Sequence, residues 1–464
     1  MDEDPFWLKD YHGTTTIHPV GLAMLMLLGL ATLLVPRRYA VIPGLLLACF
    51  VPSAQRIVFF DLDFTFIRCI VLFGVARVFM RGENGGLRWG ALDYAVLAWS
   101  VVSLLVFTAQ RGNFSALVNR TGYSFEALGL YYFFRCVIRD WRDIRAVVMA
   151  FIGFSIPIVV FLAVERTTRY NLFSVFGGVP EITRERQGRL RCQGAFSHPI
   201  LAGCFVASFL PLIGAMWWQG GLRRIASLAG VASSCAIILL CASSTPVAAV
   251  LFGMIACALY PARSLVGWVR WGVVAILVSL HMVMKAPVWH LVSRIDIVGG
   301  STGWHRYNLL DKAIRNWQQW IVLGKSSTAN WGITDITNEY VLNAVRGGGA
   351  SLLALLLILF FAFRGVGRAV KATEGDRATN FLAWALGASV FTHAMSFFSV
   401  SYFGQITMLW YLHLAMVGSA VQFTARTRSA LRRPATAART SQPAPRVRSA
   451  PSPPGPRPAP EFVA

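Results

Sequence analysis

Apolar segments long enough, or nearly long enough, to cross a membrane recur along this 464-residue chain from Ile17 to Thr424. A helix of about 20 residues spans the roughly 30 Å hydrocarbon core of a bilayer. Hydrophobic residues make up 56% of the chain and charged residues only 14%, whereas soluble domains carry about 25% charged residues. The sequence therefore predicts an all-α polytopic membrane protein with about 12–13 transmembrane helices. The expected spans are residues 17–35, 39–51, 64–80, 91–109, 124–138, 144–164, 198–218, 222–241, 246–260, 271–285, 338–363, 378–398 and 402–424.

Basic residues in the short loops between these segments set the expected orientation. If Arg37 and Arg38 face the cytoplasm, strict alternation places every other short basic loop on the same side, as the positive-inside rule requires. The N-terminus and the two long loops, residues 165–197 and 286–337, then lie outside. We expect residues 1–425 to form the transmembrane domain and the two long loops to build one external site.

The formal net charge of +22 has its origin mainly in these short loops and in the C-terminal tail. Topology therefore accounts for it, and it does not indicate a nucleic-acid partner. Residues 426–464 are rich in Pro, Ala, Ser and Arg, which predicts a disordered basic cytoplasmic tail. All cysteines except Cys192 lie in apolar runs, and Cys192 has no partner at metal-ligand spacing, so neither disulfides nor a zinc site is expected.

The first long loop carries an excess of arginine. Its segment RERQGRLRCQGAFSHP brings Arg184, Arg186, Arg189 and Arg191 to the outer end of the span that begins near His198. Arginine suits a lipid diphosphate headgroup because its planar guanidinium donates two parallel hydrogen bonds and keeps its charge. We expect Arg191, the nearest to the membrane, to bind such a ligand. Arginines farther from the membrane, such as Arg184, are expected to pair with local glutamates or anionic lipid.

The second long loop contains an expected amphipathic helix. Apolar residues at helical spacing lie on one face of the segment STGWHRYNLLDKAIRNWQQWIVLG, namely Tyr307, Leu310, Ala313, Ile314, Trp317 and Ile321. Arg306 falls on this apolar face, where a charge needs an anionic partner. That partner is either a protein carboxylate, such as Asp61 or Asp63, or a substrate phosphate, and the periodicity leaves both open.

The next segment, DITNEYVLNAVRGGG, opens a span and carries a polar stripe. Glu339, Asn343 and Arg346 are spaced to share one face of its outer half, and such stripes usually face the bundle interior and mark function. The alternative is a Glu339–Arg346 ion pair that neutralises itself inside the bundle. Glycines 347–349 allow either close helix approach or a local break.

Other ionisable residues at membrane depth carry weaker signals. Arg68 is expected to pair with a nearby aspartate. The triplet DLD at residues 61–63 resembles the acidic pair of metal-dependent lipid-phosphate-sugar transferases, although such triplets are common by chance. Three lone histidines are interpreted as core residues satisfied by hydroxyls or carbonyls: His281, His393 and His413.

In order and spacing, these loops resemble the signature regions of the O-antigen ligase and polymerase superfamily, which includes Wzy-type and exopolysaccharide polymerases. The first motif is matched by Arg191, Gly194, Phe196, His198 and Pro199. The second motif is matched by Arg306, Leu309, Ala313 and Gly324, and its closing part by Asn338, Tyr340 and Gly347. One position departs from the pattern: Thr337 stands where ligases carry a histidine proposed to activate the acceptor. Because a threonine hydroxyl is no base near neutral pH, the proton would go to Asp335, Glu339 or His305.

The resemblance implies a glycosyltransferase of the bacterial inner membrane that polymerises or ligates polyprenyl-diphosphate-linked oligosaccharides, without a metal or another cofactor. Arg191 and Arg306 would stabilise the leaving diphosphate. The expected substrate-binding residues are Arg189, His198, His305, Asn338, Tyr340 and Arg346. The implied partners are a glycan or lipid acceptor, membrane lipids and other polysaccharide-assembly membrane proteins. Two alternatives stay open: a transporter or flippase of lipid-linked sugars, and a metal-dependent transferase that uses Asp61 and Asp63.

Overall fold

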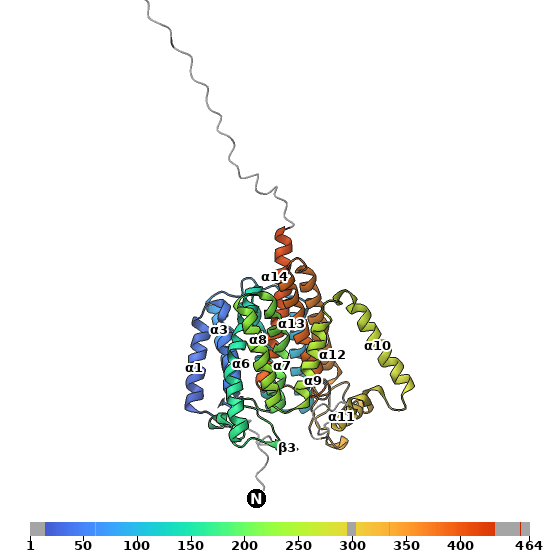
Figure 1. Ribbon diagram of the computed structural model, residues 1–464. Coiled ribbons are helices and arrows are strands. Elements are labelled where there is room, and N and C mark those ends of the chain that lie inside the picture. Colours follow the sequence, from blue (N-terminus) through green and yellow to red (C-terminus); the bar gives the residue numbers. More distant parts are fainter. Residues whose placement is uncertain (1–13, 61, 295–302, 334, 432–454, 456–464) are drawn as a thin grey trace, which may run out of the picture.

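A computed structural model of the protein describes residues 14–60, 62–294, 303–333, 335–431 and 455. These residues form 14 α-helices and two short β-hairpins, and most helices pack side by side in one bundle (Figure 1). The helices are α1 (Pro19–Leu34), α2 (Ile42–Phe50), α3 (Phe66–Met80), α4 (Ala91–Arg111), α5 (Phe114–Val137), α6 (Trp141–Thr168), α7 (Pro199–Ala215), α8 (Leu222–Leu240), α9 (Ser244–Ala258), α10 (Val266–Val283), α11 (Gly303–Arg315), α12 (Glu339–Ala372), α13 (Arg377–Ser396) and α14 (Gln405–Leu431). The strands are β1 (Arg56–Phe59), β2 (Leu62–Thr65), β3 (Glu185–Arg186) and β4 (Arg189–Leu190).

Every expected span coincides with a helix. The largest difference is in α5, which begins at Phe114 instead of residue 124. Within the described residues, seven helical segments are long and apolar enough to cross a bilayer, and α1 and α9 are shorter apolar helices. Helices such as α3 and α5 fall below this standard because they are short or carry charged residues, so fewer helices than the expected 12–13 qualify. The architecture agrees with an all-α, multi-pass membrane protein.

The helix connections gather at two ends of the bundle (Figure 1). The tail end comprises residues 35–41, 81–90, 138–140, 216–221, 259–265 and 373–376. The loop end comprises residues 51–60, 62–65, 112–113, 169–198, 241–243, 284–294, 316–333, 335–338 and 397–404. Hydrogen bonds join connections within each end, as from Arg139 to the carbonyl of Glu83 at the tail end and between the hydroxyls of Ser53 and Ser197 at the loop end. The short basic loops therefore share one end and the two long loops share the other, as the charge alternation predicts.

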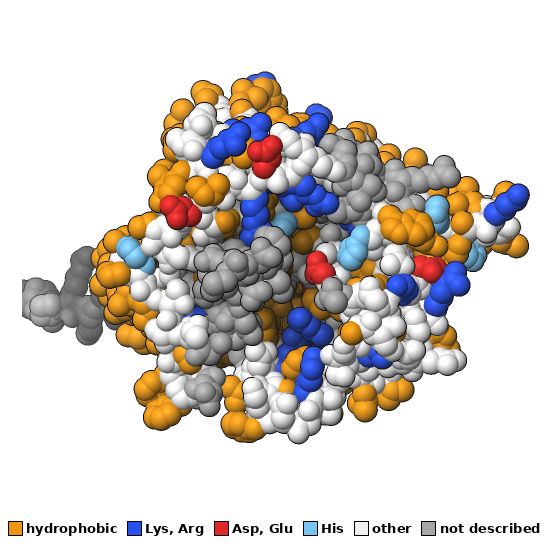
Figure 2. Space-filling model, turned by 90° about the horizontal axis from the view of Figure 1, so that it is seen from below, with side chains coloured by type: hydrophobic (Ala, Val, Ile, Leu, Met, Phe, Trp, Pro, Cys, Tyr) orange, Lys and Arg blue, Asp and Glu red, His pale blue; other side chains and the backbone are white. Residues whose placement is uncertain are grey.

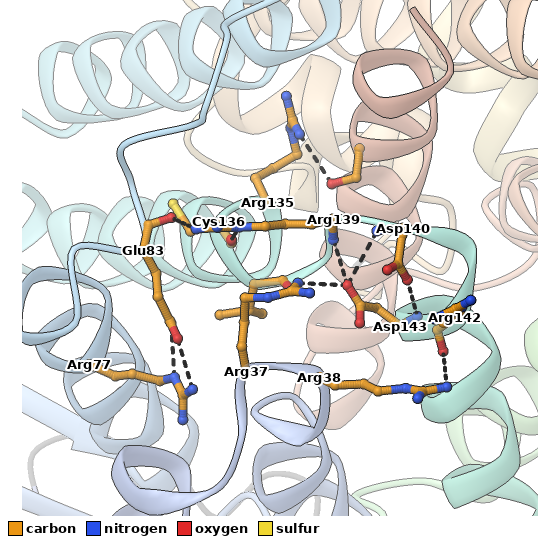
Figure 3. Close-up of polar contacts among 12 residues, drawn as sticks. Arg37, Arg38, Arg77, Glu83, Arg135, Cys136, Arg139, Asp140, Arg142 and Asp143 are labelled. Atoms are coloured by element: carbon orange, nitrogen blue, oxygen red, sulfur yellow. Dashed lines mark hydrogen bonds and ion pairs between the residues drawn. The ribbon is translucent and has the colours of Figure 1, made fainter. Parts of the chain in front are cut away.

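Buried ion pairs hold the tail end together (Figure 3). Glu83 accepts hydrogen bonds from Arg77 at 2.8 and 2.9 Å, and Arg77 also donates to the carbonyls of Thr32 and Val35 at the end of α1. Cations at a helix C-terminus satisfy its last carbonyl groups. These contacts tie α1 and α3 to the following loop and explain why α3 contains an arginine at membrane depth.

Helices α7 and α14 form the centre of the bundle, since 78% of the residues in each apolar span are buried. By contrast, α10 stands apart from the other helices (Figure 1), and none of its span is buried. The buried core consists mainly of Leu, Ile, Val and Ala side chains, and it includes the stacked pair Phe151 and Phe209, whose ring centroids lie 4.0 Å apart. The loop end is therefore supported by the two most deeply buried helices of the bundle.

A break in α12 brings the second long loop against the bundle. Gly348 has φ of 66°, which interrupts the helix. The freed amide of Gly349 donates to the carbonyl of Ile321 at 2.8 Å, and the carbonyl of Val345 accepts from the amide of Lys325 at 2.6 Å. Of the two roles open to glycines 347–349, a local break is thus present.

Helix α11 occupies the segment where periodicity predicts an amphipathic helix, but its packed face is rotated. The residues buried in α11 include Arg306, Leu309 and Ala313, whereas Ile314 is exposed. The helix also ends at Arg315, before the last two residues of the predicted face. Arg306 therefore lies nearer the centre of the packed face than the sequence indicated.

Two further segments differ from the sequence-based expectations: residues 56–65 and the end of α14. The structure forms the hairpin β1–β2 at residues 56–65, where the sequence analysis placed only a loop and the start of a span. Towards the C-terminus, α14 continues to Leu431, past the expected limit of the transmembrane domain at residue 425. Asp61 and most of the expected tail lie outside the described residues.

Candidate functional site

A cavity of about 810 Å³ opens at the loop end. Figure 2 shows this face hollowed near its centre, with Lys and Arg side chains gathered beside the hollow. The cavity wall combines the β1–β2 hairpin, α5, the start of α12, the end of the second long loop and residues 401–407. Its volume is typical of small-molecule binding sites, which occupy about 300–1,000 Å³.

Most cations in the cavity wall are held by the protein. Arg56 pairs with Asp63 at 2.7 Å, and Arg68 pairs with Glu126 at 3.3 Å. Arg111 donates to the carbonyl of Ser326. The expected aspartate partner of Arg68 is therefore wrong in part: the carboxylate comes from α5, and Asp63 contributes only its backbone carbonyl.

Arg346 differs from these cations. It is exposed, it lines the cavity, and it makes no hydrogen bond or ion pair with any other residue that the structure describes. Lys325 also lines the cavity and lies over the ring of Trp331, at 5.8 Å from its centroid. These two side chains can bind an anion without giving up a protein carboxylate.

Asp335 is the exposed carboxylate of the wall. The other two acidic residues that line the cavity, Asp63 and Glu126, are bound by arginines. Asp335 makes no such pair within the described chain. Of the three bases that the sequence analysis considered, it is the one in the cavity wall, since Glu339 and His305 do not line it.

Glu339 instead uses its carboxylate to accept hydrogen bonds from other parts of the protein. One carboxylate oxygen accepts from the amide of Tyr402 at 2.7 Å, and the other from the side-chain amide of Asn343 at 2.9 Å. Glu339 bonds directly to Tyr402 and Asn343 and not to Arg346, so the direct Glu339–Arg346 ion pair does not form between these described residues, although the charge of Arg346 still acts on the Glu339 carboxyl group. Glu339 thus fixes the α13–α14 connection, which forms part of the cavity wall.

Asn338 and Tyr340 anchor the start of α12 in the same way. The side chain of Asn338 caps α12 by accepting from the amide of Val341, and its amide group donates to the carbonyl of Phe398. The hydroxyl of Tyr340 donates to the carbonyl of Ala394 at 2.9 Å. Neither residue lines the cavity, so both position the wall rather than face a ligand there.

His198 joins the first long loop to the cavity. It lines the cavity, and its Nδ1 accepts from the amide of Ile200 at 3.1 Å, so it caps α7. Burial, followed by the charges of Arg191, Arg184 and Arg186, lowers the pKa of His198 to about 3. The imidazole is therefore neutral near pH 7, with Nε2 protonated and able to donate to a ligand.

Arg191 lies beside His198 but does not line the cavity itself. Its Nε is buried without a hydrogen-bond partner. Burial, and then the neighbouring charge of Arg186, lower the pKa of the Arg191 guanidinium. A buried donor without a partner costs free energy. An anion placed here would relieve that cost.

Arg306 is buried, with 7% of its surface exposed, and donates to the hydroxyl of Thr245 at 2.8 Å. Of the two carboxylates considered as partners of Arg306, Asp63 is paired with Arg56, and Asp61 lies outside the described residues. The amide of Cys192 donates to the carbonyl of Leu240. Arg191 and Arg306, from separate long loops, therefore both adjoin the α8–α9 connection.

Two more of the expected binding residues, besides Asn338 and Tyr340, lie away from the cavity wall. Arg189 is exposed on the β3–β4 hairpin, and His305 is half-buried in α11. Farther from the membrane, Arg169 forms an exposed pair with Glu185 at 3.7 Å, as expected for the outer arginines of this loop.

No protein-family model and no curated protein sequence matches this chain. The site must therefore be interpreted from its own residues. Among those described, no three His, Cys, Asp or Glu side chains come together in a group that could hold a metal ion.

Several wall residues and one buried pair were not predictable from the sequence pattern. Nothing in the pattern marked Arg56, Arg111 or Lys325, because single cations near helix ends are common. His393 bonds to the hydroxyl of Tyr402 at 2.8 Å, as expected, but it also bonds to His413 at 3.0 Å. The pair was missed because the two histidines lie on separate helices, α13 and α14, and each was interpreted alone.

Proposed function

We propose that the protein is a membrane glycosyltransferase of bacterial cell-surface polysaccharide assembly. It polymerises or ligates polyprenyl-diphosphate-linked oligosaccharide units in the cavity at the loop end, and this end faces outside the inner membrane. The observation that carries the proposal is Arg346, an arginine in the wall of a headgroup-sized cavity with no protein partner among the described residues. The motif resemblance of the two long loops supplies the chemistry.

The reaction places each group in a defined role. An acceptor hydroxyl attacks the anomeric carbon of the donor sugar, and the bond from that carbon to the lipid diphosphate breaks, with its electron pair leaving on the diphosphate. The hydroxyl proton passes to Asp335. Arg346 and Lys325 bind the diphosphate, and in this proposal they take the electrostatic role that a metal plays in other transferases.

Arg191 and Arg306 extend this anion site toward the α8–α9 connection. The unpartnered Nε of Arg191 supports this placement, because a diphosphate that reached it would satisfy a buried donor. His198, between Arg191 and the cavity, donates from Nε2 to a sugar or phosphate oxygen. The donor headgroup therefore lies along a line from Arg346 past His198.

The metal-dependent alternative is the weaker one on this geometry. Asp63 lines the cavity but is held by Arg56 at 2.7 Å, so it would have to leave that pair to bind a cation. Inhibition by a chelator, with rescue by a divalent cation, would favour that alternative. The transporter alternative requires that the substrate cross the membrane with its glycan linkage unchanged.

The proposal is tested by the size ladder of surface polysaccharide from cells that carry Arg346→Ala or Arg191→Ala. We expect the ladder to collapse to single repeat units if the protein is a polymerase, and to become long but unattached chains if it is a ligase. Arg169→Ala, which removes an exposed arginine of the same end, is the matched control and should leave the ladder unchanged. Normal ladders in both site variants, at normal membrane levels, would refute the site assignment.

A further inference from the structure

A second cavity lies at the opposite end of the bundle, away from the proposed reaction. It has a volume of about 520 Å³ and opens between the start of α4 and the facing ends of α12 and α14. Its apolar wall includes Phe361 of α12 and Val417 and Val421 of α14. Because α4, α12 and α14 are all long apolar segments, this groove lies at the depth where lipid chains meet headgroups.

Three arginines stand around this groove: Arg88, Arg364 and Arg368. All three are exposed, and none of their side chains makes a hydrogen bond or an ion pair with another described residue. Arg364 and Arg368 are four residues apart on α12 and therefore share one face with Phe361. The groove thus combines an apolar wall with a cationic rim.

The acidic residue inside the groove does not neutralise this rim. Asp93 accepts from Arg135 at 2.7 Å, from the hydroxyl of Tyr131 at 2.7 Å and from the amide of Gly90 at 2.6 Å. Arg135 also donates to Ser419. The polar floor is therefore satisfied by its own contacts, and the rim keeps its excess of positive charge.

We propose that this groove is a binding site for one anionic phospholipid. Its headgroup phosphate binds Arg88, Arg364 and Arg368, and an acyl chain lies over Phe361 and Val421. Guanidinium groups bind phosphate oxygens through paired hydrogen bonds, and basic pockets between membrane helices bind anionic headgroups. The pair of Trp89 and Tyr94, with ring centroids 5.6 Å apart, adds an aromatic contact at headgroup depth beside the rim.

Charge argues against the other occupants of this groove. The chain's own segment beyond Leu431 contains many arginines and only one acidic residue, so it carries the same sign as the rim. A second copy of the protein would likewise bring three arginines against three arginines if the two grooves faced each other. A lipid with a phosphate and an apolar chain matches both halves of the groove.

Native mass spectrometry of the detergent-purified protein tests this proposal with phosphatidylglycerol and with phosphatidylcholine of the same chains. We expect phosphatidylglycerol to bind in preference, and Arg364→Gln with Arg368→Gln to weaken its binding roughly 30-fold. The matched control, Arg263→Gln with Arg270→Gln, removes the same charge at the same end outside the groove and should keep binding within about threefold of wild type. Equal binding of the two lipids, or equal losses in both double variants, would overturn the proposal.

Two further experiments distinguish a lipid from free phosphate and cover the case in which the arginine variant does not fold. Glycerol phosphate carries the headgroup charge without chains, and it should fail to displace phosphatidylglycerol; complete displacement would mean that the groove binds free phosphate. If the arginine variant does not fold, Val421→Trp fills the apolar half while every rim arginine remains. Loss of phosphatidylglycerol binding in that variant supports the lipid site, and unchanged binding places the lipid elsewhere.

Discussion

The charged side chains in the wall of the loop-end cavity divide into a paired set and an unpaired set. Arg56 and Arg68 are bound to carboxylates, so they shape the wall, whereas Arg346 and Asp335 face the cavity without such partners among the described residues. A substrate can bind the unpaired groups without first displacing a protein partner, whereas binding to Arg56 or Arg68 would require breaking an ion pair. We therefore assign the chemistry to the unpaired set.

Asp335→Asn tests this assignment, because it removes a base and changes the volume little. We expect the transfer rate to fall by roughly 100-fold or more, as is typical for loss of a general base. His305→Gln is the control, since His305 lies outside the cavity wall and should leave the rate within about threefold of wild type. Rates are measured on purified protein with a lipid-linked donor; full activity in Asp335→Asn would remove it from the mechanism.

His198 makes a prediction about pH. Its pKa of about 3 in the folded protein lies below the ordinary value of 6.5, so the unfolded chain takes up a proton between these values while the folded protein does not. Folding stability therefore falls as the pH drops from about 6.5 toward 3. His198→Asn keeps a capping side chain but removes this titration. We expect its Tm to fall less than that of wild type between pH 7 and pH 5; equal falls would contradict the buried neutral histidine.

At the scale of elements, the break in α12 is the feature on which the cavity depends. The break lets the loop residues 321–325 bond to α12, and Lys325 then reaches the cavity wall. Gly348 has a positive φ, and a Cβ there would lie 2.5 Å from the carbonyl oxygen of Val322. Only glycine fits both conditions.

Gly348→Ala should therefore destabilise the protein by about 1–3 kcal/mol, the usual cost of a strained backbone position. Gly367→Ala is the matched control on the same helix, because a Cβ there meets no atom within 4 Å and its φ is not positive. We expect the control to be neutral or slightly stabilising. Thermal unfolding in detergent compares the two, and equal losses would mean that the break at Gly348 is not required.

The positions of the helices were predictable from sequence, because apolar length alone determines which segments can span a bilayer. The β1–β2 hairpin was not predictable, because its apolar residues look like the start of a transmembrane span. The pairing of its two strands also leaves no helical periodicity in the sequence that could reveal it. The rotation of the packed face of α11 was not predictable either. The helix buries Arg306 and Leu309 against other parts of the fold, and the spacing of apolar residues within the helix carries no information on those contacts. In the cavity, His198, Arg346 and Asp335 were named in advance, but the wall cations Arg56 and Lys325 come together only in the fold.

In the whole molecule, successive helices of the bundle run alternately between the tail end and the loop end, and the two ends carry different arrangements of charged side chains. Buried ion pairs such as Arg77–Glu83 tie the tail end together, while the loop end keeps an open cavity with free charges. The net charge of +22 is consistent with this division, because the short basic connections all lie at the tail end. We infer that this end faces the cytoplasm and that the reaction takes place on the other side.

The most direct test of the central claim follows the purified protein in liposomes supplied with a polyprenyl-diphosphate-linked oligosaccharide. The account predicts a new glycosidic linkage, with one polyprenyl diphosphate released for each linkage formed, and loss of both products in Arg346→Ala. Movement of the intact donor across the bilayer, with no change in its glycan, would contradict the account and identify a transporter.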